Sequence, residues 1–120
     1  MHEGPAGIRH RVNVAKGEHH QIEPGMIITD EPGLYIAGKH GIRTENCLVV
    51  KEEGENEYGK WLCFESMTLV PYDLDAVDFS LLDEKEIAYL NAYNRRVYDT
   101  ISPHLTSEEA RWLKKYTREI

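Results

Sequence analysis

The chain has 120 residues, of which 41% are hydrophobic and 29% charged, and its net charge is −7. This length is one ordinary domain or a piece of a larger one, and an acidic chain without a basic cluster is a poor partner for nucleic acid or anionic membranes. No apolar run is as long as a membrane span, and two cysteines are too few for a disulfide scaffold. We expect Cys47 and Cys63 to be buried reduced thiols and the protein to be cytoplasmic.

The first half of the chain is predicted to be mainly β. Residues 1–20 are polar and glycine-rich, which is typical of a loop. Strand-like apolar runs follow at about 26–31, 42–51 and 60–70. The stretches between them, 34–40 and 51–59, have the composition of turns. We therefore expect an antiparallel sheet.

The second half is predicted to be helical. Apolar residues recur at helical spacing between Asp83 and Thr100, in the series Ile87, Leu90, Tyr93, Val97 and Ile101. A second helix begins after Thr106, which is placed to form a capping box with Glu109. Trp112 lies on its expected apolar side, as a core or interface anchor. The predicted fold class is α+β, an antiparallel sheet followed by a two-helix tail.

Two glutamates fourteen positions apart, Glu31 and Glu45, are the strongest candidates for chemistry. If the chain folds back as an antiparallel hairpin centred on Gly38, positions whose numbers sum to 76 face each other, and Glu31 lies opposite Glu45. Like charges directly across a ladder repel, so this register needs a compensating partner. A divalent cation held by both carboxylates is the most economical one.

Arg43 is expected to share a face with Glu45, because side chains at i and i+2 of a strand project to the same side. From there Arg43 could orient a metal-binding carboxylate or steady a substrate carbonyl. Spacing alone leaves a second interpretation equally open. In that interpretation the segment is a surface hairpin with solvated acids, one of them paired with Arg43.

Three segments carry a family resemblance: His2-Glu3-Gly4-Pro5, Thr29-Asp30-Glu31-Pro32-Gly33 and Gly41-Ile42-Arg43-Thr44-Glu45-Asn46. Their order and the spacing of the glutamates resemble the last three active-site motifs of aminopeptidase P, the Xaa-Pro aminopeptidases of the pita-bread metallopeptidase group. The resemblance implies the C-terminal portion of a pita-bread fold. Residues 1–80 would then be a β-rich, incomplete part of the catalytic domain, and residues 81–120 its helical C-terminal tail.

The resemblance also implies a reaction, hydrolysis of the bond between an N-terminal residue and a following proline, with peptides that carry proline at the second position as substrates. Glu31 and Glu45 match two ligands of a dinuclear metal centre, usually manganese, and Glu45 would bridge both ions. Arg43 matches an arginine that supports the centre. His2 matches a histidine that positions substrate and stabilises the tetrahedral intermediate. Two such cations depress the pKa of a shared water.

The family's remaining ligands, two aspartates and a histidine, lie upstream of the position of His2, and here only Met1 precedes it. We expect Met1 to be a start placed for expression or one in a truncated reading frame. Two carboxylates seldom hold two divalent ions, so we expect the fragment alone to be inactive and its metal site empty or weakly occupied. A truncated sheet exposes strand edges and apolar surface, so we also expect a homo-oligomer.

Two other functions stay open. A non-catalytic dimerisation or interaction module derived from this fold would use the aromatic-rich helical tail as its interface. Another member of the same metallohydrolase group would differ in substrate selectivity. The acidic pair favours an enzyme, because a binding module has no physical need for two opposed carboxylates.

Overall fold

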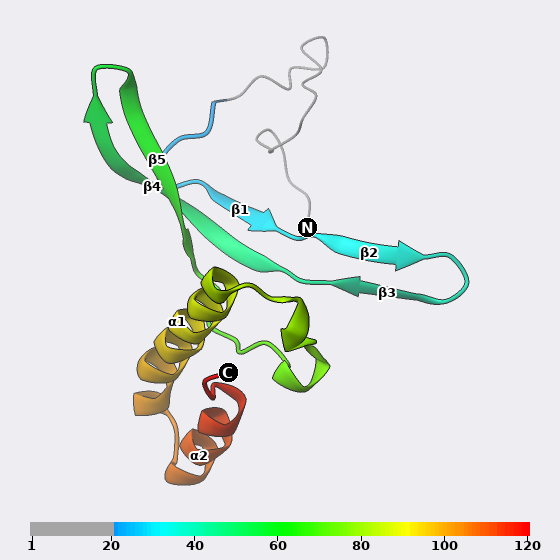
Figure 1. Ribbon diagram of the computed structural model, residues 1–120. Helices are drawn as coiled ribbons and strands as arrows, with labels where there is room; N and C mark the ends of the chain where they lie inside the picture. Colours follow the sequence, from blue (N-terminus) through cyan, green and yellow to red (C-terminus); the bar gives the residue numbers. More distant parts are fainter. Residues whose placement is uncertain (1–20) are drawn as a thin grey trace. The chain divides into compact units, whose positions relative to one another are not determined.

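The computed structural model describes residues 21–120. The chain forms two compact units, which are joined in sequence at Thr68 and Leu69. Among the described residues, the first unit contains five strands and the second contains two α-helices with short 3₁₀ segments (Figure 1). This content confirms the predicted α+β class. The predicted loop over residues 1–20 lies outside the described residues.

Every strand pair in the first unit is antiparallel. The strands are β1 (Ile27–Asp30), β2 (Gly33–Ile36), β3 (His40–Arg43), β4 (Asn46–Asn56) and β5 (Gly59–Ser66). Strands β1, β4 and β5 form one sheet with β4 in the middle, and β2 and β3 form a second, two-stranded sheet beyond the end of the β1–β4 pair (Figure 1). The apolar run of β4 reaches its most buried point at Val50, which is 1% exposed.

The predicted turn at 34–40 is shorter than expected. Residues Leu34 to Ile36 belong to β2, because apolar and aromatic side chains favour the extended backbone. The turn itself spans only 37–39. Gly38 adopts a φ of 71° there, a conformation that glycine reaches without steric cost. The predicted centre of the hairpin is therefore confirmed.

The segment 51–59, predicted to be an exposed turn, is also mostly strand. Strand β4 runs to Asn56, and a two-residue turn leads into β5 at Gly59. Charged side chains are tolerated here because they pair across the strands, Lys51 with Glu65 and Lys60 with Glu52. The run predicted over 60–70 ends as a strand at Ser66.

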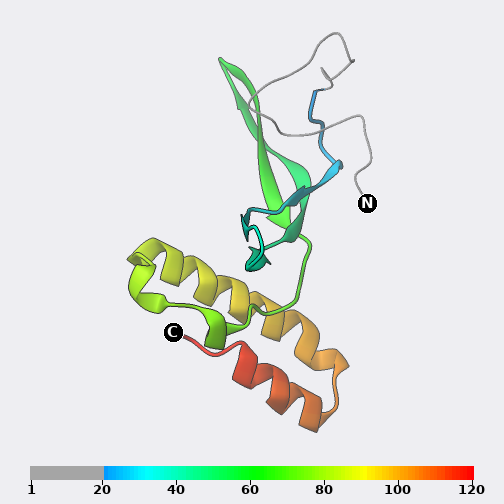
Figure 2. The same cartoon turned by 90° about the vertical axis from the view of Figure 1, so that its right-hand side faces the viewer.

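The second unit is a helical hairpin preceded by two single 3₁₀ turns. Its elements are η2 (Leu74–Ala76), η3 (Phe79–Leu81), α1 (Glu84–Ile101), η4 (Ser102–His104) and α2 (Ser107–Tyr116). Both views show α1 and α2 side by side, joined through η4 (Figures 1 and 2). The predicted capping box of Thr106 and Glu109 is present, and Asp83 forms another with Glu86 at the start of α1. Each box satisfies backbone N–H groups that lack a partner in the first helical turn.

The core of this unit forms where the apolar faces of the two helices meet. Tyr93, Val97 and Leu113 are buried, and Leu69, Tyr72, Tyr98, Ile101 and Leu105 pack against them. Trp112, predicted to be a core or interface anchor, is not in the core, because its side chain is 59% exposed and lies against the ring of Tyr116, with centroids 4.5 Å apart. Its role as an interface anchor stays a prediction. One residue along a helix is a rotation of about 100°, so Leu113 takes the inward position.

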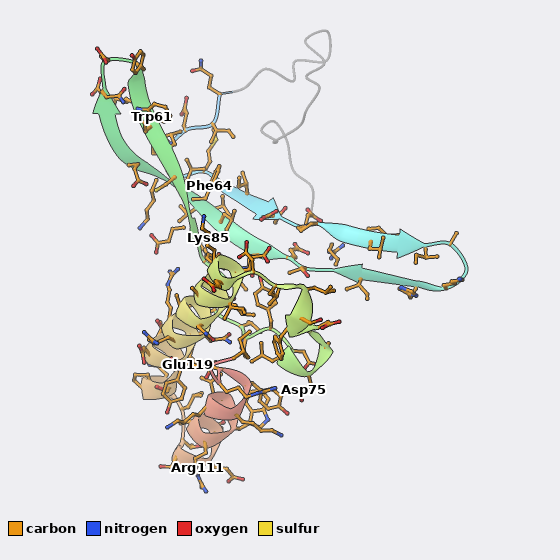
Figure 3. All side chains as sticks on the ribbon, viewed as in Figure 1. Trp61, Phe64, Asp75, Lys85, Arg111 and Glu119 are labelled. Carbon is orange, nitrogen blue, oxygen red and sulfur yellow. The ribbon has the colours of Figure 1, made fainter. Side chains whose placement is uncertain are left out.

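The segment after α2 is held to the rest of the unit by its backbone as well as by its side chains. The amide of Asn91 donates to the carbonyl oxygen of Ile120 at 3.1 Å and accepts from its N–H at 3.0 Å. Arg118 pairs with Asp75 and Arg95 with Glu119, each at 2.6 Å; Figure 3 labels the two acids. These contacts order a stretch that has no secondary structure of its own.

Many large hydrophobic side chains are exposed in the described part of the first unit. Its exposed large hydrophobic side chains are Ile27, Leu34, Tyr35, Ile36, Ile42, Tyr58, Trp61, Leu62, Phe64 and Met67, of which Figure 3 labels Trp61 and Phe64. Exposed apolar area of this kind marks a surface that another chain segment or protein covers. No helix within residues 21–120 has both the length and the apolar character that crossing a membrane needs.

The two cysteines are free, as predicted, but only half-buried. They lie on strands of the sheet at intermediate exposure, so the prediction that both thiols are buried is wrong. A hydrogen bond with the carboxylate of Glu53, together with partial desolvation, raises the pKa of the Cys63 thiol.

Candidate metal centre

Two of the three strand pairs described in the first unit share one register. In the β1–β4 pair Asp30 faces Asn46, and in the β2–β3 pair Gly33 faces Arg43, so position numbers sum to 76 in both. The N–H of Thr44 donates to the carbonyl of Pro32 at 3.0 Å, which carries the same register across the gap between the pairs. Glu31 therefore lies opposite Glu45, at the junction of the two sheets.

The missing N–H of Pro32 explains the hydrogen-bond pattern at the junction between the two sheets. Residues that face each other in an antiparallel ladder alternate between hydrogen-bonded and non-hydrogen-bonded pairs. Pro32 and Thr44 form a hydrogen-bonded pair with only one bond, because proline has no N–H to return. The neighbouring pair, Glu31 with Glu45, is then non-hydrogen-bonded, the type whose Cα atoms come within about 4.5 Å and whose side chains lie closest.

Each glutamate has a hydrogen-bond donor two residues before it on the same strand face. The hydroxyl of Thr29 donates to Oε1 of Glu31 at 2.8 Å. The Nε of Arg43 lies 3.0 Å from Oε2 of Glu45, and the two side chains are 45% and 31% exposed. The prediction that Arg43 and Glu45 share a face is confirmed. Both carboxylates are thus oriented by the chain that carries them.

Tyr35 lies on the same strand face and forms a hydrogen bond with Arg43. Its ring lies along the strand face above Gly41 and Gly33. A β-carbon at Gly41 would come within 2.7 Å of the ring, and one at Gly33 within 2.6 Å of the hydroxyl. The hydroxyl accepts a hydrogen bond from Arg43. This bond is the main cause of the raised pKa of Arg43, followed by the charge of Glu45 and, more weakly, that of Glu31.

Tyr35 is the residue that the sequence analysis missed. Glycines beside a tyrosine on one strand face leave space for its aromatic ring. Here Gly41 faces Tyr35 across the ladder, and Gly33 precedes it by two residues on the same strand. That signal becomes visible only once the register is known. His2, the fourth predicted site residue, lies outside the described residues.

The described residues fit part of a metal centre. Two carboxylates on one face, with a single guanidinium beside them, leave one negative charge uncompensated among these three side chains. Carboxylate oxygens are hard ligands that suit Mg²⁺, Ca²⁺ and Mn²⁺. Within residues 21–120, however, no group of three or more His, Cys, Asp and Glu side chains is arranged to hold an ion. A complete centre needs ligands from other residues.

Comparison with known proteins assigns the family. Residues 1–52 match metallopeptidase family M24, and residues 60–120 match the family described as the C-terminal region of peptidase M24. These two matches place the chain among the metallopeptidases. The chain belongs to family M24, and it contains the family's C-terminal region.

The relatives and a solved structure agree. Xaa-Pro aminopeptidase app-1 of Caenorhabditis elegans is 40% identical over 129 residues, which cover 100% of this chain and 20% of that protein. Aminopeptidase P1 of Arabidopsis thaliana is 37% identical over 123 residues, 100% of this chain and 19% of its own length. The chain therefore spans about a fifth of the length of these relatives.

The crystal structure of X-prolyl aminopeptidase from Caenorhabditis elegans, described as a cytosolic enzyme with a di-nuclear active site, has a TM-score of 0.81 and 37% identity to this chain. The match covers 99% of this chain and 19% of that one. It confirms the predicted fold, the C-terminal portion of a pita-bread architecture, and the predicted family resemblance.

Proposed function

We propose that this segment works as the C-terminal part of a longer, metal-dependent Xaa-Pro aminopeptidase that hydrolyses the bond between an N-terminal residue and a following proline. The observation that carries the proposal is the pair of opposed carboxylates, Glu31 and Glu45, each held by its own donor in a chain of family M24. The relatives named as Xaa-Pro aminopeptidases support the substrate class. Peptides with proline at the second position are then the partners.

In this proposal Glu31 and Glu45 would hold two divalent ions together with further ligands, and Mn²⁺ is the expected metal. When bound, such ions lower the pKa of a shared water towards neutrality. The remaining ligands belong to a region upstream of this segment. The di-nuclear active site of the C. elegans enzyme supports the number of ions.

The other site residues act through position and charge. Arg43 holds the Glu45 carboxylate in one orientation, and Tyr35 in turn holds Arg43 on the strand face. His2 is proposed to position the substrate and to donate to the oxygen that becomes negative in the tetrahedral intermediate. Preorganised donors and ligands of this kind need no rearrangement when the reaction occurs.

The wider proposals follow from the same comparison. We assign residues 1–80 to the catalytic domain and 81–120 to its helical tail, and we expect a cytoplasmic protein. The exposed apolar surface of the first unit, which includes Leu34 and Ile42, fits a face that the rest of a longer chain or a second copy covers. A homo-oligomer is the expected assembly.

The test uses a longer chain in which this segment is preceded by the region that its relatives carry. With Mn²⁺, that chain should cleave Xaa-Pro peptides, and the 120-residue segment alone should not. Glu31→Gln and Glu45→Gln should each reduce kcat/KM more than about 100-fold, the upper end of what losing an outer partner of a metal site costs. Glu55→Gln, at an exposed acid on β4, is the matched control.

Two results would overturn the proposal. One is Xaa-Pro cleavage by the purified 120-residue segment. The other is unchanged metal content and activity in the Glu31→Gln variant of the longer chain, the outcome expected of a non-catalytic interaction module that has no use for the acidic pair.

A further inference from the structure

Thr29 lies beside the acidic pair and has no role in the function proposed above. Its hydroxyl donates to Oε1 of Glu31 at 2.8 Å. Thr29 and Glu31 are two positions apart along β1 and its extension, so their side chains project to the same face. Thr29 faces Cys47 across the ladder, and only the Asp30–Asn46 pair separates these two residues from the pair formed by Glu31 and Glu45.

We propose that Thr29 is a positioning residue that fixes the Glu31 carboxylate in its metal-binding orientation. The proposal rests on the function proposed above and extends it to a residue outside the ligand set. Ligating carboxylates are themselves commonly hydrogen-bonded, and removal of such an outer partner typically weakens metal binding by about 10- to 100-fold.

The two donors beside the acidic pair differ in charge, and this difference supports the inference. Arg43 orients Glu45 and also neutralises part of its charge. Thr29 orients Glu31 through a neutral hydroxyl, so this hydrogen bond places no positive charge beside the carboxylate. A second guanidinium in place of Thr29 would cancel the charge of the pair and compete with the metal. A short neutral donor is the side chain that orients the carboxylate without this competition.

A purely structural role for Thr29 makes a different prediction. Threonine is a good strand former because of its branched β-carbon, and valine keeps that branching while removing the hydroxyl. If Thr29 serves only the strand, Thr29→Val is silent. If it positions Glu31, Thr29→Val is harmful and Thr29→Ser, which keeps the hydroxyl and loses the branching, is mild.

The experiment measures the Mn²⁺ dissociation constant of the longer chain by electron paramagnetic resonance, together with the melting temperature of each metal-free variant. Thr29→Val should weaken Mn²⁺ binding about 10-fold or more, and Thr29→Ser by less than about threefold. Thr44→Val is the matched control, since Thr44 lies on the same ribbon with its side chain on the opposite face. Thr29→Ala replaces the valine variant if that variant does not fold.

Glu31→Gln separates this inference from the proposed function. If Glu31→Gln abolishes high-affinity Mn²⁺ binding while Thr29→Val binds like the unmodified chain, Thr29 is not a positioning residue and the proposed function stands. If Thr29→Ser weakens binding as much as Thr29→Val, the hydroxyl is irrelevant and the inference also fails. If Glu31→Gln binds Mn²⁺ normally, the proposed function itself is overturned.

Discussion

Replacing Gly33 with alanine is the sharpest test of the arrangement around Arg43. A β-carbon at Gly33 would lie 2.6 Å from the hydroxyl oxygen of Tyr35, 2.7 Å from its Cε2 and 2.8 Å from its Cζ. Non-bonded carbon atoms need about 3.5 Å. The ring must therefore move by about 0.7 Å or more.

The exposure of the Tyr35 side chain indicates the direction in which its ring moves. Tyr35 is 65% exposed, so its ring can swing into solvent without disturbing a core. The backbone of Gly33 does not need a positive φ, and alanine inside a strand is more favourable than glycine by about 0.5–1 kcal/mol. We expect Gly33→Ala to leave the melting temperature unchanged or slightly raised. In this variant the Tyr35 ring should move away from Gly41, and Arg43 should lose the tyrosine hydroxyl as a hydrogen-bond acceptor.

Nuclear magnetic resonance measures this outcome directly on the 120-residue chain. Cross-peaks between the Tyr35 ring and the α-protons of Gly41 should be strong in the unmodified chain and absent in Gly33→Ala. Gly54→Ala is the control, because a β-carbon at Gly54 would meet no atom within 4 Å. Retained cross-peaks in Gly33→Ala would refute the close packing of the Tyr35 ring against Gly33. A large fall in melting temperature would show that moving the ring costs more stability than this reasoning allows.

Three further predictions concern the stability of the second unit, each followed by urea or thermal unfolding. Asn91→Ala removes two hydrogen bonds to the backbone of Ile120 and should lower the free energy of unfolding by about 1–3 kcal/mol, whereas an unchanged value would mean that the C-terminal segment is not held in solution. Leu113→Ala empties a core position that is 4% exposed and should cost about 2–5 kcal/mol; a cost below 1 kcal/mol would contradict the packing described. Hydrogen bonds with Thr106 lower the pKa of Glu109, so its stabilising effect is complete above the unfolded carboxyl pKa of about 4.3 and is lost as the pH falls through the folded value. Glu109→Gln can still close the capping box and should show a smaller fall in melting temperature between about pH 6 and pH 3 than the unmodified chain; an equal fall would assign the acid sensitivity to other carboxyls.

Local rules of backbone chemistry predicted much of this fold. Gly38 marked the centre of a hairpin, and from that centre the registers of the β2–β3 and β1–β4 pairs follow by counting. A polar cap located the start of the second helix, since Thr106 is a residue type that accepts from free N–H groups of a first turn. These features depend on a few neighbouring residues, which is why the sequence alone is enough for them.

Features that depend on distant partners were predicted less well. Strand β4 continues through charged residues because β5 supplies both backbone hydrogen bonds and opposite charges, and composition alone favoured a turn there. Whether Trp112 is a core or an interface anchor could not be decided from the sequence, since only the position of α1 decides which of two adjacent apolar residues faces inward. Tyr35 could not be identified, because the glycines under its ring become neighbours only after the hairpin has formed.

The register of the acidic pair is fixed twice, from independent sides. Slippage by one residue would place Glu31 opposite Thr44 or Asn46 and would send the facing side chains to different sides of the ribbon. The β2–β3 turn opposes this slippage from one end and the β1–β4 pairing from the other. If a substitution at Gly38 loosened β2–β3, the β1–β4 ladder would still hold Glu31 opposite Glu45, whereas the packing of Tyr35 would be lost. The placement of the two carboxylates is therefore more robust than the placement of Tyr35 and Arg43, and this is the order of robustness that the proposed metal site requires.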